Sequence, residues 1–521
     1  MDLKETVIGI EFGSTRIKSV LVGRDYKVLA SGSYTWENSY VNGIWTYSLD
    51  EVKAGVQACF ADLKHDVHEK YGVTLSTAGA IGVSAMMHGY LPFDAQDNQL
   101  CEFRTWRNTI TGEAAEKLSG LFDFNIPQRW SIAHLYQAIL NKEDHLPKLS
   151  YITTLAGYVH YILTGKKVMG IGEASGMFPI DSDTLDYDAE MLAKFNALKE
   201  VKNYGFDLRK LLPKVLPAGA DAGTLTEAGA LFLDPTGEFE AGIPVVPCEG
   251  DAGTGMVATN SVRVRTGNVS AGTSDFAMVV TEKKLNRHRE IDMVTTPSGA
   301  PVAMVHCNNC TSDTNAWASM FTQILNLYGF DVDKDTLFTK MFKAALDGDP
   351  DCGGLISYNY YSGEGVTDVQ EGRPIFLRKA DSKFTLPNFM RMHLYSALAT
   401  LKIGMDILAD EDVNIDKIFG HGGYFKTEGV GQRILSAAIN TPVSVMETAS
   451  EGGPYGMALL GAYAIWKDRD ETLEDYLDHK VFAECKSSTV MADKAEVDGF
   501  NSFIEVYKNC LDVEKLAIER F

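Results

Sequence analysis

Two β-hairpins with small, hydroxyl-bearing tips constrain the fold of this chain more than any other sequence feature. The first runs through VIGIEFGS and IKSVLVG and turns at residues 13–15, and the second runs through RTGNVSAGTSDFAMVV and turns at residues 272–274. β-Branched residues fill the strands beside each turn. The tips lie about 259 residues apart, a spacing that indicates a repeat at the scale of a domain rather than a solenoid period.

The length of 521 residues is too great for one hydrophobic core and predicts a division into domains. After the first hairpin, an apolar stripe predicts a helix over 49–71, which Ser48 and Glu51 begin with a capping-box pattern, and a buried strand follows over 78–86. A helical crossover returns the chain parallel to earlier strands, so an α/β domain with a mixed sheet is expected. We place the domain boundary just before Gly250, which gives domains 1–249 and 250–521.

The second half repeats this plan after its hairpin. The pattern predicts a helix over 394–409, a strand over 416–423, a helix from about residue 431, a strand over 442–447 and a closing helix over 456–466. Residues after 466 are helical in pattern and highly charged, which predicts a C-terminal appendage. The segment 184–207 is polar and helix-prone, as expected of an insertion.

Composition limits the classes of partner. The formal charge of −22 is not relieved by any basic cluster, so nucleic acid and anionic membrane surfaces are not expected partners. The N-terminus is acidic and leads directly into a strand, and no run of about 18 apolar residues occurs, so a cytoplasmic, soluble protein is expected. The eight cysteines are scattered, and Cys307 and Cys310 lack a second pair at zinc spacing, which favours reduced thiols.

The hairpin tips suit phosphate binding. Backbone N–H groups and hydroxyls at a small tip can bind phosphate oxygens, and a carboxylate at the strand end, Glu11, can hold hydrated magnesium. One such tip is more often structural, but two at corresponding positions fit a two-domain phosphate clamp. No Walker motif is present, because LTGKKV lacks the upstream glycine spacing and the following Ser or Thr.

Two further motifs follow predicted strands. CEGDAGTGM opens a helix at Asp251, where a carboxylate can accept a proton from a substrate hydroxyl. The alternative interpretation is that Asp251 only caps the helix. GHGGYFK places Gly422 and Gly423 after a strand, where the backbone can approach a flat ligand closely.

The order of EFGSTR, SAMMHG, EGDAG, SAGTS, GHGG and EGGPYGMALLGAYA resembles the FGGY carbohydrate kinases, members of the actin-like, sugar kinase and Hsp70 ATPase superfamily. The stretch YVHYILTGKKVMGIGEASGMFPID is also similar to that family, and the resemblance spans residues from about Val7 to Trp466. It implies two actin-like (ribonuclease H-like) α/β domains around an interdomain cleft. It also implies a kinase that uses ATP and Mg²⁺ to phosphorylate a small sugar.

The resemblance assigns roles residue by residue. Asp251 matches the catalytic base, and Met87 and His88 match sugar-facing residues of xylulokinases. Trp106 and Asn108 fall in the segment that the resemblance assigns to the sugar pocket. The implied ATP and phosphate contacts are Gly13, Ser14, Thr15, Gly272, Thr273, Ser274, Gly422 and Gly423. Glu11 is the implied metal residue.

Three departures from the family pattern concern the metal and the substrate. Glu11 replaces an Asp in the first phosphate loop. Asn108 and Ile110 stand where the family often has Asp and Arg after the Trp, and Met86 occupies the Gln position of xylulokinases.

The expected substrate is a ketose such as xylulose or ribulose, with rhamnulose, fuculose or a polyol left open and glycerol less expected. The rival function is an ATP-driven conformational switch without sugar chemistry, and a third is a degenerate kinase that binds sugar without turnover. Whether the chain forms a homodimer is also left open.

Overall fold

The computed structural model describes residues 2–448 and 452–521. Packing divides the chain into two compact units that are discontinuous in sequence. The first contains the chain up to Val262, the segment Asp292–Val302 and the segment that ends at Glu484. The second contains Arg263–Ile291, the chain from Ala303 through β21 (Val443–Met446), and Cys485–Phe521.

The first unit is built on a sheet in the order β13-β6-β1-β2-β3. β1 pairs antiparallel with β2 and parallel with β6, which itself pairs parallel with β13. The strands are β1 (Thr6–Phe12), β2 (Arg16–Gly23), β3 (Val28–Thr35), β4 (Ser39–Val41), β5 (Ile44–Thr46), β6 (Ala80–Ala85), β7 (Leu91–Phe93), β8 (Tyr151–Thr153), β9 (Val168–Gly170), β10 (Ile180–Asp181), β11 (Asp186–Tyr187), β12 (Lys214–Leu216) and β13 (Glu249–Gly250). The predicted first hairpin and its parallel partner are therefore confirmed.

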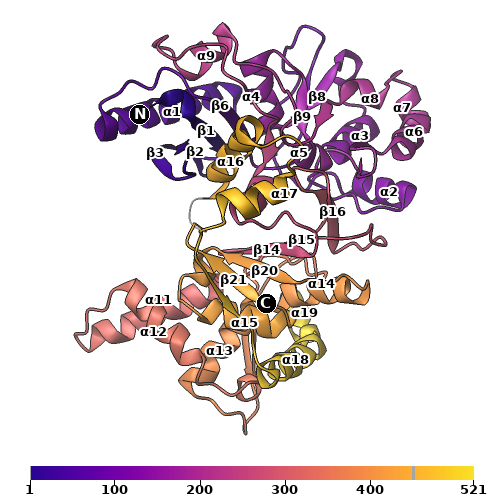
Figure 1. The fold of residues 1–521 in the computed structure, drawn as a ribbon. Helices are drawn as coiled ribbons and strands as arrows, with labels where there is room; N and C mark the ends of the chain where they lie inside the picture. The colour runs from indigo at the N-terminus through magenta and orange to yellow at the C-terminus, as the bar shows by residue number, and fades with distance from the viewer. Residues whose placement is uncertain (1, 449–451) are drawn as a thin grey trace. The chain divides into compact units, whose positions relative to one another are not determined.

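Helices cover this sheet and extend one side of the unit. α1 forms as predicted: Ser48 and Glu51 complete a capping box, and the apolar stripe that includes Phe60 is buried. The helices α2, α3, α6 and α7 gather at the side of the unit away from α1 (Figure 1). The helices are α1 (Leu49–Tyr71), α2 (Gly112–Phe122), α3 (Ser131–Asn141), α4 (Leu155–Thr164), α5 (Ile171–Ser175), α6 (Ala189–Ala197), α7 (Lys199–Lys202), α8 (Leu208–Leu211), α9 (Glu227–Leu233), α10 (Asp251–Ala258), α16 (Gly452–Trp466) and α17 (Leu473–Tyr476).

Helix α16 joins the first unit from far along the chain. It packs on β1, β6 and α10, although the sequence pattern suggested a place in the second domain. Glycines allow this close approach: a Cβ on Gly9 of β1 would lie 2.0 Å from the Pro454 carbonyl oxygen, and one on Gly456 would lie 1.9 Å from the Thr254 carbonyl oxygen. The α10–α16 contact therefore depends on backbone packed against backbone. The division into domains 1–249 and 250–521 stays a prediction.

The second unit repeats the hairpin-based sheet. Its strands run in the order β17-β15-β14-β20-β21-β22, with β14 antiparallel to β15 and parallel to β20. The chain passes between the units in β16 (Ile291–Thr295) and β17 (Pro301–Cys307). The other strands are β14 (Thr266–Ala271), β15 (Asp275–Val280), β18 (Leu355–Tyr358), β19 (Ile375–Arg378), β20 (Lys417–His421), β21 (Val443–Met446) and β22 (Ser487–Val490).

The helices of the second unit differ from the predicted ones in two places. The single helix predicted over 394–409 is two helices, because Thr385 caps a helix that starts at Leu386 and the non-helical backbone of Leu398 separates it from the next. The C-terminal appendage contains a strand, β22, which pairs with β21. The helices are α11 (Ser312–Leu327), α12 (Lys334–Ala345), α13 (Leu386–Ala397), α14 (Ala399–Asp410), α15 (Val430–Ile439), α18 (Lys494–Asn509) and α19 (Leu511–Arg520).

Membrane-spanning helices and the cysteines were both addressed by the sequence. Across the described residues, no helix combines the length and apolarity needed to cross a membrane. All eight cysteines carry free thiols, five of them buried and three partly exposed. Cys307 and Cys310 are among the five buried thiols, and their reduced state stays a prediction.

Candidate active site

Three loops of the first unit begin where adjacent parallel strands end. Phe12, Ala85 and Gly250 are register partners at the ends of β1, β6 and β13. The Met86 N–H donates to the Phe12 carbonyl at 2.9 Å, which ties the first two loops together. Because the carboxyl ends of parallel strands meet at one edge of a sheet, the tip 13–15, the loop with Met87 and the helix that starts at Asp251 share this edge.

Asp251 is the first residue of α10 and is fixed by backbone donors. Its Oδ1 accepts hydrogen bonds from the Met87 N–H at 3.1 Å and from the Ala252 N–H at 2.9 Å. The residue remains partly exposed, yet burial of the carboxyl raises its pKa from the ordinary value, while these backbone donors oppose the rise. A carboxylate with a raised pKa that keeps an open side is suited to accept a proton.

Glu11 lies beside Asp251 at the end of β1. Burial, followed by the negative charge of Asp251, raises the pKa of Glu11 to about 7, and Lys18 opposes the rise. A Cβ on Gly453 would lie 1.9 Å from the Glu11 Oε1, so the glycine at the start of α16 makes room for this carboxylate. Glu11 and Asp251 therefore form a pair of carboxylates whose mutual repulsion a cation would relieve.

Met87 and His88 form the loop after β6. His88 has a left-handed backbone (φ 73°), which is uncommon for a residue other than glycine and clusters at functional sites. Its Nδ1 lies 3.2 Å from the Gly176 carbonyl oxygen, and its ring stacks near Trp130 at a centroid distance of 6.1 Å. A Cβ on Gly250 would lie 2.9 Å from the Met87 Cγ, which places Met87 directly against the end of β13, the strand that precedes Asp251.

Two buried glutamates next to Asp251 were missed by the sequence analysis. Glu249 accepts hydrogen bonds from the Glu173 N–H at 2.8 Å and the Gly172 N–H at 3.3 Å, and burial raises its pKa to about 8. Burial also raises the pKa of Glu173 well above its usual range, with Asp251 and Glu249 adding to the effect. Both lie inside motifs that the resemblance used, EGDAG and GIGEASG, but a sequence does not reveal which glutamate is buried.

The predicted sugar residues Trp106 and Asn108 lie in the loop before α2. Trp106 is partly exposed, whereas Asn108 is buried. The Asn108 Oδ1 accepts from the Trp45 N–H at 2.9 Å, and its Nδ2 donates to the Trp45 carbonyl at 2.8 Å. Both ends of this amide are therefore engaged by β5, and a contact between Asn108 and sugar stays a prediction.

In the second unit, the tip 272–274 and the predicted adenosine glycines follow adjacent parallel strands. Ser270 of β14 pairs with His421 of β20. Gly422 has a φ of 97°, and a Cβ there would lie 2.4 Å from the Ala271 carbonyl oxygen, so only glycine fits beside the strand that leads into the tip. Gly423 begins the next turn, and a Cβ added there would meet no atom within 4 Å. The fold thus brings Gly272 and Gly422 together, as a nucleotide site in this unit requires.

The tip of the second hairpin is held through its carbonyl groups. The Gly272 carbonyl accepts from the Thr311 N–H at 3.0 Å and hydroxyl at 2.6 Å, and the Thr273 carbonyl accepts from the Cys310 N–H at 3.0 Å. Behind the tip, Asp275 is fully buried, and burial together with the charge of Glu364 raises its pKa well above the usual range. Thr273 and Ser274 are exposed, which leaves their N–H groups and hydroxyls available to a ligand.

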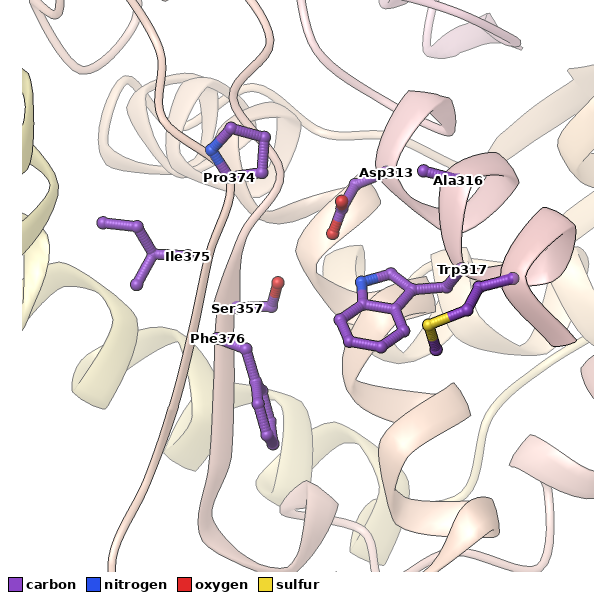
Figure 2. Close-up of a pocket in the computed structure, with 8 residues that line it drawn as sticks. Asp313, Ala316, Trp317, Ser357, Pro374, Ile375 and Phe376 are labelled. Carbon is purple, nitrogen blue, oxygen red and sulfur yellow. The ribbon is translucent and has the colours of Figure 1, made fainter. Parts of the chain in front are cut away.

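A cavity of about 310 Å³ also lies in the second unit, beside α11. Its lining comprises Asp313, Ala316, Trp317, Met320, Ser357, Pro374, Ile375 and Phe376. Figure 2 shows the polar ends of Asp313 and Ser357 facing the same space as the edge of the Trp317 indole, and burial raises the pKa of Asp313 to about 6. The lining includes none of the five predicted nucleotide residues of this unit, so their assignment rests on loop geometry instead.

Comparison with known proteins identifies two family models that together cover most of the chain. The N-terminal domain of the FGGY family of carbohydrate kinases matches residues 6–258, and the C-terminal domain matches residues 267–465. A xylulose kinase of Haemophilus influenzae is 23% identical over 485 residues, covering 90% of this chain and 92% of the relative.

Solved structures show the same fold at low identity. A ligand-bound xylulose kinase from Lactobacillus acidophilus matches with a TM-score of 0.78 and 16% identity, covering 98% of both chains. A gluconate kinase from the same organism matches with a TM-score of 0.79 and 17% identity over the same share of each chain. The predicted α/β fold with two actin-like domains is confirmed. The nearly equal TM-scores do not indicate whether xylulose or gluconate is the better model for the substrate of this chain.

The raised pKa of Glu249 predicts how stability changes with pH. An ordinary glutamate loses its proton near pH 4.5 in the unfolded chain, whereas the folded chain holds the proton to about pH 8. Between these values the folded state binds more protons, so the free energy of unfolding of the wild type falls as pH rises. Glu249→Gln removes this pH-dependent contribution. As pH rises from 5 to 8, the urea concentration at the midpoint of unfolding should therefore increase for the variant relative to the wild type.

Glu240→Gln, at an exposed position, provides the matched control and should follow the wild type at every pH. A constant difference between Glu249→Gln and the wild type from pH 5 to pH 8 would show that Glu249 is ionised in the folded protein.

Proposed function

Because the chain belongs to the FGGY family of carbohydrate kinases, we propose that it transfers the γ-phosphate of ATP to a hydroxyl of a neutral ketose such as xylulose or ribulose. The observation that carries this proposal is the meeting of a phosphate tip, a His-containing loop and the Asp251 carboxylate at the ends of β1, β6 and β13. A conformational switch would need no base at this edge.

Asp251 is the proposed base. Its carboxylate accepts the proton of the sugar hydroxyl as the hydroxyl oxygen attacks the γ-phosphorus, and ADP leaves with the electrons of the broken P–O bond. The Met87 and Ala252 N–H groups hold one oxygen of the carboxylate, which leaves the other to the substrate. Burial raises the pKa of Glu249 to about 8 and that of Glu173 well above its usual range, which favours their neutral forms and limits the negative charge beside Asp251.

ATP and Mg²⁺ fit the residues that are present. Within the described residues, the backbone N–H groups of Ser14 and Thr15 in the first tip, and of Thr273 and Ser274 in the second, donate to no backbone carbonyl. Both tips therefore offer hydrogen-bond donors to phosphate oxygens. Glu11 and Asp251 supply hard carboxylate oxygens, and no described cluster of three or more His, Cys, Asp or Glu could hold a metal alone. This matches an ion that neutralises phosphate charge and takes most ligands from phosphate and water.

The charge around Asp251 favours a neutral sugar. Glu11, with a pKa of about 7, lies beside the Asp251 carboxylate, and Lys18 is the cation whose charge acts on Glu11. A sugar acid such as gluconate would bring a further negative charge into this acidic environment, which is unfavourable without a paired cation. The proposal therefore ranks ketoses above aldonic acids despite the equal fold likeness.

The test is the release of ADP from MgATP across a panel of xylulose, ribulose, rhamnulose, fuculose, glycerol and gluconate. A ketose should raise the rate well above the sugar-free background, and gluconate should not. If no sugar raises ADP release while ATP alone is hydrolysed, the switch function replaces the kinase proposal. If a sugar binds without turnover, the protein is a degenerate kinase.

Asp251→Asn tests the base directly. The substitution keeps shape and most hydrogen bonding, so sugar and nucleotide should still bind. Loss of general-base catalysis should lower kcat by roughly 10²- to 10⁴-fold. Initial rates at saturating ATP and sugar measure the effect, with the exposed Asp221→Asn as control. A variant that retains more than about a tenth of the rate would remove Asp251 from the mechanism.

Glu11→Gln tests the metal residue. Loss of its charge should raise the magnesium concentration needed for half-maximal rate and lower kcat, while sugar affinity stays near that of the wild type. Magnesium keeps several waters, so a carboxylate one methylene shorter can still reach it, and Glu11→Asp should be much milder. Magnesium titrations of the initial rate compare the three proteins. Wild-type magnesium dependence in Glu11→Gln would make Glu11 a structural residue.

A further inference from the structure

All three carbonyl groups of the first hairpin tip accept hydrogen bonds from two aromatic residues. The Trp36 Nε1–H donates to the Gly13 carbonyl at 2.7 Å, and the Tyr47 hydroxyl donates to the Ser14 carbonyl at 2.6 Å. The Trp36 backbone N–H donates to the Thr15 carbonyl at 3.2 Å. We propose that Trp36 and Tyr47 are positioning residues that orient tip 13–15 for phosphate, an inference that rests on the proposed kinase function.

The two aromatic side chains form a rigid support. Their rings stack with centroids 4.2 Å apart and an angle of 26° between the planes, and both residues are buried. Phe12, the last residue before the tip, packs against the Trp36 ring at a centroid distance of 6.1 Å. The donors cannot swing away from the tip without breaking this packing, so they hold the carbonyl groups in one direction.

Holding the carbonyl groups determines where the N–H groups point. The peptide plane fixes a carbonyl and the following N–H in opposite directions, so a carbonyl held toward Trp36 or Tyr47 turns the next N–H away from them. Ser14 and Thr15 thus present their N–H groups outward from the support, as donors to a phosphate require. The second tip uses the same device, but there backbone N–H groups of Cys310 and Thr311 supply most donors.

The support continues into the loop that carries Trp106. Tyr47 directly follows β5, and Trp45 of β5 is clamped through both its N–H and its carbonyl by the Asn108 amide. The Thr105 hydroxyl also donates to the Trp45 carbonyl at 3.1 Å, and the Arg107 guanidinium lies 4.1 Å from the Trp45 ring centroid. Residues 105–108 and the phosphate tip are therefore attached to the same short strand.

The chain turns tightly to make this connection. β4 and β5 form a hairpin around Asn42 and Gly43, both with positive φ (51° and 84°), as a type I′ turn requires. Trp36 precedes this hairpin and Tyr47 follows it, so the hairpin closes the two donors onto each other. Tyr40, on the same hairpin, is 63% exposed and contacts the Trp45 ring rather than the tip. It offers a matched control for Tyr47.

The experiment compares Tyr47→Phe, Trp36→Phe and the control Tyr40→Phe with the wild type. Tyr47→Phe keeps the stacked ring and removes only the hydroxyl donor. Loss of one such hydrogen bond should lower kcat/KM for MgATP by about 3- to 10-fold. The dissociation constant of the sugar measured without nucleotide should not change, and amide hydrogen exchange in peptide 13–16 should be faster. Trp36→Phe should act in the same direction.

The outcomes separate a positioning role from a structural one and from failure of the kinase proposal. Tyr40→Phe should match the wild type in all three measurements. A wild-type KM for MgATP and wild-type exchange at 13–16 in Tyr47→Phe would overturn the inference, as would an equal effect of Tyr40→Phe. If the wild type turns over no sugar, the proposed function fails, while calorimetric MgATP affinity and hydrogen exchange of the same variants still decide the inference.

Discussion

The parallel pairing of β1, β6 and β13 is the constraint on which the proposed chemistry depends. It aligns Phe12, Ala85 and Gly250, and each strand then releases its loop at the same edge of the sheet. Helix α16 supports this edge by packing on β1, β6 and α10, where Gly9 allows the close approach of β1 and Gly456 that of α10. Gly456 of α16 thereby fixes α10, the helix that begins with Asp251. The position of the base therefore depends on contacts between segments some 200 residues apart.

Burial of acids at this edge has a cost and a consequence. Four carboxyl groups lie together, and burial raises the pKa values of Glu249 and Glu173, which favours the neutral form of each over an ionised form paired with a cation. Glu11, with a pKa of about 7, is near its point of balance at neutral pH. A cation that arrives with a polyphosphate would shift that balance toward the ionised form, so nucleotide binding and the charge state of the site are thermodynamically linked.

The sequence predicted local features well because they depend on neighbouring residues. Both hairpins, the capping box of α1 and the strand ends that carry Asp251 and Gly422 follow from period, capping and turn chemistry. Two kinds of feature were not predictable this way. The attachment of α16 to the first unit depends on long-range packing, and the raised pKa values of Glu173 and Glu249 depend on burial by segments that are distant in sequence. The break at Leu398 has no Gly or Pro beside it, and the one glycine of the predicted stretch, Gly404, lies inside α14.

Asn108, one of the departures from the family pattern, has a local explanation. Trp45 presents both an N–H and a carbonyl to this side chain, and an amide can satisfy both because it carries a donor and an acceptor. An ionised Asp at position 108 could accept from the Trp45 N–H but would place a negative oxygen against the Trp45 carbonyl. The hairpin of β4 and β5 therefore selects Asn at this position. If the sugar needs a carboxylate in this region, it must come from another residue, and Asp251 already lies at the adjoining edge of the sheet.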